Sequence, residues 1–158
     1  MDKSYDVVIV GGAIYGSALA WWLTKLDFAG SVLVVERDPT YAYASTSHTN
    51  SCIRQQFSNE TNIRISQFGA EFIKNFRSFM GGDPDVPDLV LQSYGYMYLA
   101  DTPEFAADLK EAQAIQASLG AATQHMPRDE IAAAYPFYQL DDIVGGHHNL
   151  TDEGYFDG

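Results

Sequence analysis

Residues 6 to 36 place a glycine turn between a short apolar run and a helical pattern, and this segment limits the possible folds more than any other. Val7 to Val10 is apolar throughout, as expected for a parallel strand buried on both faces. The run stops at Gly11 and Gly12, which let the backbone turn sharply and approach a pyrophosphate, and Gly16 lets the following helix pack closely against the strand. The pattern predicts a βαβ unit whose turn can hold phosphate.

The predicted helix runs from Ala13 to about Leu26, and its free N–H groups and positive dipole end would face that phosphate. Ala13 stands where the pattern usually has its middle glycine, and its methyl group crowds the approach slightly. A second apolar strand is predicted from Ser31 to Val35. It delivers Glu36 about 20 residues after Gly16, the separation at which an acid meets the ribose hydroxyls of adenosine.

An acid at this position favours a free ribose over a 2′-phosphate, so FAD and NAD are compatible with the turn and NADP is disfavoured. The order and spacing of these elements match the pattern throughout: strand, turn, helix, second strand and acid. They predict a site for an ADP-containing dinucleotide. The alternative is an ordinary βαβ unit whose glycines serve only the turn.

Composition excludes several classes of function. The chain has 158 residues, 46% of them hydrophobic, which is typical of a soluble globular protein. Its 9 basic and 21 acidic residues give a net charge of -12, which argues against binding to nucleic acid or to an anionic membrane surface. A single cysteine, Cys52, excludes an internal disulfide and a cysteine metal cluster, and no metal site is expected. Neither a signal peptide nor a membrane span is seen, so a cytoplasmic protein is expected.

Beyond Glu36 the chain alternates between long connections and short elements. The polar stretch 37–61 is long for a connection inside a compact domain, and loops of that length are usually functional. A helical stripe of apolar residues follows from Asn62 to Phe79, with Thr61 or Asn59 as its cap. After the Gly- and Pro-rich boundary at 80–88, the predicted elements are strands at 89–92, 94–100 and 143–149 and helices at 103–119 and 128–135.

The dinucleotide-binding sheet is incomplete in this sequence. Only two of its strands are found, whereas a doubly wound α/β sheet has several parallel strands covered on both faces. The remaining strands are therefore expected from sequence that is absent here or from another chain.

The chain resembles the FAD-dependent oxidoreductases of the D-amino acid oxidase, glycine oxidase and sarcosine oxidase or dehydrogenase group. The resemblance covers the whole chain and rests on VVIVGGAIYGSALAWWL, VLVVERD, the AST…IRQQFS loop, GYMYLA before a TPE-capped helix, and EGYFDG. Members of the group continue well beyond this point, so the sequence resembles an N-terminal portion of one of them.

The resemblance implies an α/β fold in which a mixed-sheet substrate domain is inserted in a Rossmann-like FAD-binding domain, both incomplete in this chain. Residues 1–86 would belong to the FAD-binding domain, 87–150 would begin the substrate domain, and 151–158 would return to the FAD-binding domain. FAD would be bound in an extended form, and the contacts implied for its ADP half are Gly11, Gly12, Ala13, Ile14, Gly16, Glu36 and Arg37.

The reaction implied is oxidation of the C–N bond of an amine or amino acid, sarcosine-like or a D-amino acid, with hydride transfer to flavin N5. Oxygen or another redox carrier would reoxidise the flavin. The cofactor supplies the difficult chemistry, and protein groups orient the substrate and tune the flavin.

Further site residues are implied in the loop that follows the second strand. Ser45, Thr46 and Ser47 stand where the group's polar loop touches pyrophosphate and ribityl oxygens, although their hydroxyls could instead satisfy their own backbone. Arg54 falls where an arginine approaches the flavin ring, and the alternative for it is a structural ion pair. His48 lies in a loop similar to the one in which sarcosine and dimethylglycine dehydrogenases attach FAD covalently through a histidine.

Two other functions stay open at this point. An NAD-dependent dehydrogenase fits the first 36 residues, but its domain would continue promptly into another βαβ element, which the serine-rich loop does not provide. A flavin-binding scaffold or assembly factor would bind FAD without turning over any amine.

Overall fold

The computed structural model describes residues 4–157, and the chain divides into two compact units, Met1–Asn50 and Ser51–Gly158. The domain boundaries implied by the resemblance, after residues 86 and 150, concern a complete flavoprotein and stay predictions. Within 4–157, no helix combines the length and the apolar character needed to cross a membrane.

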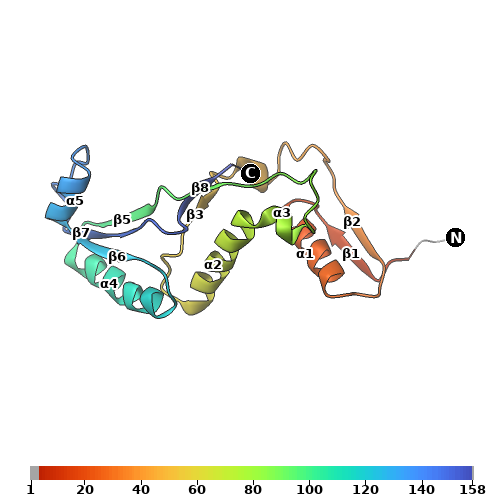
Figure 1. The fold of residues 1–158 in the computed structure, drawn as a ribbon, viewed down its shortest axis with the longest axis horizontal. Helices are drawn as coiled ribbons and strands as arrows, with labels where there is room; N and C mark the ends of the chain where they lie inside the picture. Colours follow the sequence, from red (N-terminus) through yellow and green to blue (C-terminus); the bar gives the residue numbers. More distant parts are fainter. Residues whose placement is uncertain (1–3, 158) are drawn as a thin grey trace. The chain divides into compact units, whose positions relative to one another are not determined.

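The first unit contains the βαβ element predicted from the glycine turn. Strand β1 (Val7–Val10), helix α1 (Ile14–Lys25) and strand β2 (Val32–Val35) follow in order, and the two strands pair in parallel from Val7 opposite Val32 to Val10 opposite Val35 (Figure 1). The prediction of strand, helix and strand is confirmed to within one residue at each bound.

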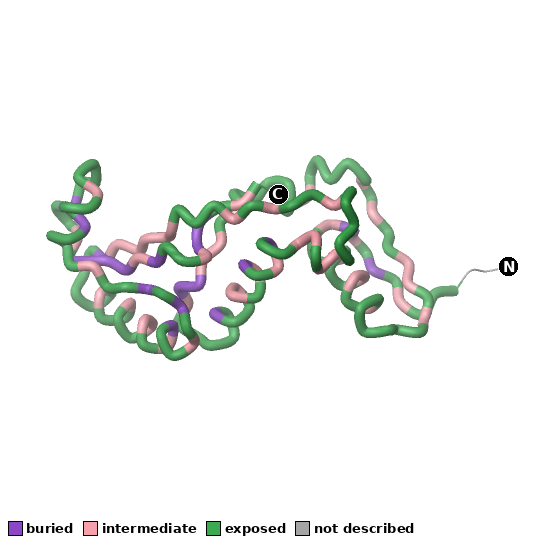
Figure 2. The backbone as a smooth tube through the Cα atoms, viewed as in Figure 1, coloured by how far each residue is buried: buried purple, intermediate pink, exposed green. Residues whose placement is uncertain are grey.

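Much of the apolar surface of this unit is exposed. Helix α1 has no buried residue, and Tyr15 on it is 91% exposed. Val10 in β1 is 86% exposed, and Figure 2 shows green over most of α1. A two-stranded parallel sheet is far smaller than the sheets in which such strands normally lie, so these apolar surfaces mark where further strands and helices belong.

The second unit contains two antiparallel sheets of three strands each. One has the order β3–β8–β4 and is made of β3 (Cys52–Ile53), β8 (Gly154–Phe156) and β4 (Leu91–Gln92). The other has the order β5–β7–β6 and is made of β5 (Tyr96–Ala100), β7 (Gly145–Asn149) and β6 (Gln124–Pro127). Strands β3, β6 and β8 are absent from the sequence-based prediction because each is short and shows no clear alternation of polar and apolar residues.

Helices α4 (Pro103–Ser118) and α5 (Arg128–Ala134) cover opposite faces of the β5–β7–β6 sheet (Figure 1). His147 in β7 lies on the side of α4, where it lines a cavity with residues of that helix. Its neighbour His148 points the other way and reaches Tyr135, which follows α5, with 3.3 Å between Nε2 and the phenol oxygen. Successive side chains of a strand lie on opposite faces, as this pair shows.

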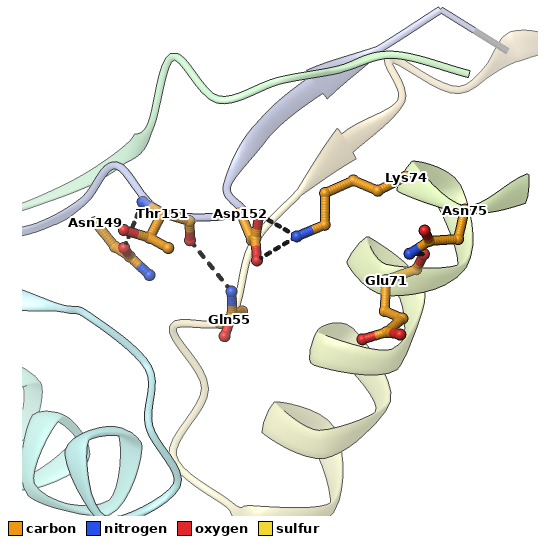
Figure 3. Close-up of polar contacts among 7 residues, drawn as sticks. All are labelled: Gln55, Glu71, Lys74, Asn75, Asn149, Thr151 and Asp152. Atoms are coloured by element: carbon orange, nitrogen blue, oxygen red, sulfur yellow. Dashed lines mark hydrogen bonds and ion pairs between the residues drawn. The ribbon is translucent and has the colours of Figure 1, made fainter. Parts of the chain in front are cut away.

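The helix predicted for 62–79 is broken in two. Helix α2 (Glu60–Lys74) ends at Asn75, and the single turn α3 (Phe76–Phe79) follows. The Asn75 amide Nδ2 donates to the Glu71 carbonyl oxygen at 3.0 Å (Figure 3). Such a local bond between side chain and backbone competes with continued helix.

The structure also decides between the two candidate caps of α2. The Asn59 side-chain oxygen accepts the Asn62 N–H at 2.9 Å, whereas Thr61 lies inside the helix and is exposed. Asn59→Ala is expected to lower the free energy of unfolding by about 1 kcal/mol, because it leaves a helix N–H without its acceptor. Thr61→Ala, the matched control, is expected to leave it unchanged or slightly raised, because alanine favours helix. Urea unfolding of the full-length variants measures both, and equal effects would contradict the cap assignment.

Candidate functional site

Two positions of the glycine turn exclude residues with a side chain, one by its backbone conformation and one by lack of space. Gly11 has φ +98°, a conformation that residues with a side chain rarely adopt. At Gly16 the restriction is one of space, because a Cβ atom there would lie 1.8 Å from the Gly11 carbonyl oxygen. Helix α1 therefore begins directly against the end of β1, as the glycine pattern predicts.

Glu36 closes the turn from the side of β2. Its Oε2 accepts the Gly12 N–H at 2.7 Å, and its Oε1 accepts the Asp38 N–H at 2.8 Å. These two bonds, first that from Asp38 and then that from Gly12, hold the pKa of the Glu36 carboxyl below its usual value. The carboxylate is therefore ionised and fixed in place, with lone pairs left to accept ribose hydroxyls.

Three N–H groups at the start of α1 donate to no group among the described residues, those of Ala13, Tyr15 and Gly16. Unpaired N–H groups at a helix N-terminus fit the oxygens of a pyrophosphate. The Ile14 N–H is close to the Thr46 hydroxyl oxygen at 3.4 Å. The structure thus brings Thr46 to the predicted phosphate position, and these residues fit the ADP half of FAD.

The other loop residues are held in part by their own backbone. They form a single turn of 3₁₀ helix, η1 (Ser45–His48), in which the Ser47 hydroxyl donates to the Tyr41 carbonyl oxygen at 2.8 Å. The His48 Nε2 lies 2.8 Å from the Ala42 carbonyl oxygen and must carry the proton to donate to it. Ser45 and Arg37 are exposed. For Ser47, the local role that the sequence left open is the one this structure shows.

Arg54 belongs to the second unit, where aromatic rings surround it. Its guanidinium carbon lies 4.8 Å from the ring centre of Phe57, 5.6 Å from that of Tyr96 and 5.7 Å from that of Tyr98. Its Nε is buried and has no hydrogen-bond partner among the described residues. No ion pair of Arg54 is found in this part of the chain, so the alternative of a structural ion pair lacks support at residues 4–157.

A buried carboxylate fixes the segment that carries Arg54. Glu153 has 0% exposure, and its Oε1 accepts the Gln55 N–H at 2.6 Å and the Asn149 Nδ2 at 2.9 Å. Its Oε2 accepts the Gln56 Nε2 at 2.8 Å. Burial raises the pKa of the Glu153 carboxyl, while these three bonds and the charge of Arg54 oppose that rise.

Further polar contacts join Gln55 of this segment, and separately α2, to the turn before β8 (Figure 3). The Gln55 side-chain amide donates to the Thr151 carbonyl oxygen at 3.2 Å. In the same turn the two Asp152 carboxylate oxygens accept from the Lys74 ammonium at 2.7 and 2.8 Å. Residues about 100 positions apart in the chain are therefore held side by side.

A cavity of about 340 Å³ lies beside Arg54, between α4 and the β5–β7 pair. Its lining includes Arg54, Gln56, Phe57, Tyr98, Gln116 and His147. His147 is 1% exposed, and burial, with a smaller contribution from His125, lowers the pKa of its imidazole from 6.5 to about 4. His147 is therefore neutral at pH 7.

The residues with buried polar groups around this cavity were not found from the sequence, namely Gln56, Gln116, His147 and Glu153. Only the consecutive glutamines after Ile53-Arg54 hint at a polar cluster, and nothing in the chain locally relates them to Glu153, 97 residues away from Gln56. Within residues 4–157, no group of three or more histidine, cysteine or acidic side chains is arranged to hold a metal ion.

Comparison with known proteins identifies the fold just described. Residues 6–158 match the family model described as FAD dependent oxidoreductase. The chain belongs to this family. The α/β fold predicted from the sequence, incomplete in this chain, is thereby confirmed.

Curated relatives and solved structures agree with this family. FAD-dependent oxidoreductase domain-containing protein 1 is 37% identical in Xenopus laevis and 38% identical in Bos taurus, over 96% of this chain and 31% and 32% of those proteins. The chain thus spans about a third of the length of these relatives. The structure of L-proline dehydrogenase from P. horikoshii matches with a TM-score of 0.74 at 24% identity, over 98% of this chain and 39% of that one. Glycine oxidase from Geobacillus kaustophilus matches with a TM-score of 0.71 at 21% identity, over 96% and 40%.

The neutral, buried imidazole of His147 predicts a loss of stability in acid. As the pH falls below about 6.5 the unfolded chain takes up a proton at this residue, whereas the folded protein does not do so until about pH 4. The unfolded state then binds more protons, so the free energy of unfolding falls by up to about 3 kcal/mol across this window. His147→Phe is expected to remove this part of the pH dependence.

Urea unfolding of the full-length protein at pH values from 7 to 4 provides the measurement. The comparison isolates His147, because Glu153 and every other titrating group are common to the two proteins. An identical pH dependence in wild type and His147→Phe would contradict the assignment.

Proposed function

We propose that this chain is the N-terminal, ADP-binding portion of an FAD-dependent oxidoreductase that oxidises the C–N bond of an amine or amino acid. The observation that carries the proposal is the turn in which Gly11 and Gly16 permit close approach and Glu36 is held ionised beside Gly12. The family match favours FAD over the NAD that the first strands alone would permit. Glycine oxidase and L-proline dehydrogenase, by their names, act on amino acids.

In this proposal the residues of the first unit bind FAD. Glu36 accepts the ribose hydroxyls, and the N–H groups at the start of α1, with Gly12, Ala13 and Ile14 beside them, face the pyrophosphate. Thr46 adds a hydroxyl at the same place, while Ser45 and Arg37 lie at the exposed rim. Further sequence or another chain supplies the remaining strands of the sheet.

Bound FAD would supply the acceptor for a hydride from the substrate carbon next to nitrogen. Arg54, which the resemblance puts near the flavin ring, would offer a positive charge there, and its guanidinium forms no ion pair among the described residues. Oxygen or another redox carrier would take the electrons onward, and the protein would work in the cytoplasm.

An absorption spectrum of the full-length protein, before and after acid precipitation, tests the cofactor. Flavin bands that move into the supernatant would establish non-covalent FAD. Yellow colour that stays in the pellet, and is lost in His48→Ala, would establish attachment at His48. A colourless protein that cannot be reconstituted with FAD would overturn the proposal, whereas bound FAD without turnover of any amine would favour a scaffold.

Glu36→Ala is expected to weaken FAD binding by roughly 1 to 3 kcal/mol, because the ribose loses a charged acceptor. Asp27→Asn serves as the control, since it removes one negative charge from an exposed position of the same unit. Titration of the flavin-free proteins with FAD measures both affinities. An unchanged affinity in Glu36→Ala would place the ribose elsewhere.

A further inference from the structure

We propose that Tyr41 is a second ribose-binding residue of the dinucleotide site, whose phenol donates to a ribose hydroxyl oxygen while Glu36 accepts the hydrogen of the same hydroxyl. The position of the phenol beside Gly12 carries the inference. It rests on the proposed function, because it assigns a further residue to the ADP half of the FAD site.

The phenol oxygen of Tyr41 lies at the glycine turn. A Cβ atom at Gly12 would be 3.0 Å from that oxygen and 3.4 Å from the Cβ atom of Glu36. The phenol and the base of the Glu36 side chain therefore lie around one point, on the side of Gly12 where a side chain would project. Glycine at position 12 leaves that space to the phenol.

The loop after β2 holds Tyr41 from both sides. The Tyr41 N–H donates to the Asp38 carbonyl oxygen at 3.0 Å. The Tyr41 carbonyl oxygen accepts the Ala44 N–H at 3.0 Å and the Ser47 hydroxyl at 2.8 Å. Tyr41 has φ +57°, the left-handed region that bulky residues rarely adopt. Backbone held in such a conformation by its surroundings is found most often at binding and active sites.

The phenol is available to a ligand. Among residues 4–157 no hydrogen bond of the Tyr41 phenol oxygen is found, and the side chain is 36% exposed. Each carboxylate oxygen of Glu36 accepts one N–H, from Gly12 or from Asp38, and keeps a further lone pair. At this place one group can donate and the other can only accept.

A ribose hydroxyl satisfies both groups at once. It has one hydrogen to donate and two lone pairs with which to accept. Its hydrogen goes to the Glu36 carboxylate, and its oxygen then accepts the Tyr41 O–H. Each bond polarises the hydroxyl in the sense that strengthens the other. A phosphate oxygen without a hydrogen could not bridge the two groups and would be repelled by the charge of Glu36.

Tyr41→Phe tests the contact, because it removes the phenol oxygen and keeps the ring. Titration of the flavin-free, full-length protein with FAD is expected to show an affinity lowered about three- to tenfold, the effect of one neutral hydrogen bond. Tyr43→Phe is the matched control, since Tyr43 belongs to the same loop and is 85% exposed. It should keep the wild-type affinity. Thermal unfolding of the flavin-free proteins checks that both variants are folded.

Forms of FAD that lack the 2′- or the 3′-hydroxyl of the adenosine ribose separate a ribose contact from a general effect of the substitution. A bond between Tyr41 and one hydroxyl cannot form when that hydroxyl is missing. The loss of affinity caused by Tyr41→Phe should therefore disappear with at least one of the two deoxy forms, as in a double-mutant cycle. A purely structural role of Tyr41 would weaken the binding of all three ligands by the same factor.

Two results would overturn the inference. One is an unchanged FAD affinity in Tyr41→Phe, which would leave the phenol to solvent. The other is an equal loss with FAD and with both deoxy forms, which would mean that the phenol does not touch the ribose. Both results keep the proposed function, because both require a wild-type protein that binds FAD. A wild-type protein that cannot be reconstituted with FAD would overturn the proposed function and this inference together.

Discussion

The side chain of Glu153 is the constraint on which the second unit depends. A carboxylate with no exposure to water is unfavourable unless hydrogen bonds replace its hydration, and Gln55, Gln56 and Asn149 provide three of them. Because the donors belong to the Arg54 segment and to β7, their bonds hold these parts of the chain in register. Removing the carboxylate would leave the Gln56 amide nitrogen bonded to the Tyr96 carbonyl oxygen alone and the Gln55 N–H without its acceptor.

The contacts of the two units differ in how far apart their partners lie in the sequence. In the first, every contact of the candidate site lies within a short stretch, such as the bond from the Gly12 N–H to Glu36, 24 residues on. In the second, Gln55 and Glu153 are 98 residues apart. The dinucleotide turn therefore depends on contacts within a short stretch of sequence, whereas the cavity forms only when the whole second unit has folded.

This difference explains what could be predicted from the sequence. The strands and helix around Gly11 follow from local pattern and backbone sterics, and the structure confirms them. The prediction of one continuous helix through Asn75 is wrong, because the backbone of Asn75 leaves helical geometry there, where its side-chain amide also donates to the Glu71 carbonyl oxygen. Strand β8 could not be predicted, because its pairing with β3 and β4 depends on segments far away in the chain. Gln116 looks like any polar residue on a helix until the fold places it beside Phe57.

The buried polar atoms around the cavity require hydrogen-bond partners that residues 4–157 do not supply. Each amide oxygen left dry and unpaired costs about 1 to 3 kcal/mol, and a folded domain is stable by only about 5 to 15 kcal/mol. Hydrophobic side chains in place of Gln56 and Gln116 would not avoid such a cost, because the Tyr96 and Phe57 carbonyl oxygens and Glu153 would then lose their donors. The amides are held rigidly by carbonyl and carboxylate partners on one side, so their oxygens are presented in one direction only. Each amide therefore joins two parts of the second unit through its nitrogen, and its oxygen needs a donor from outside residues 4–157.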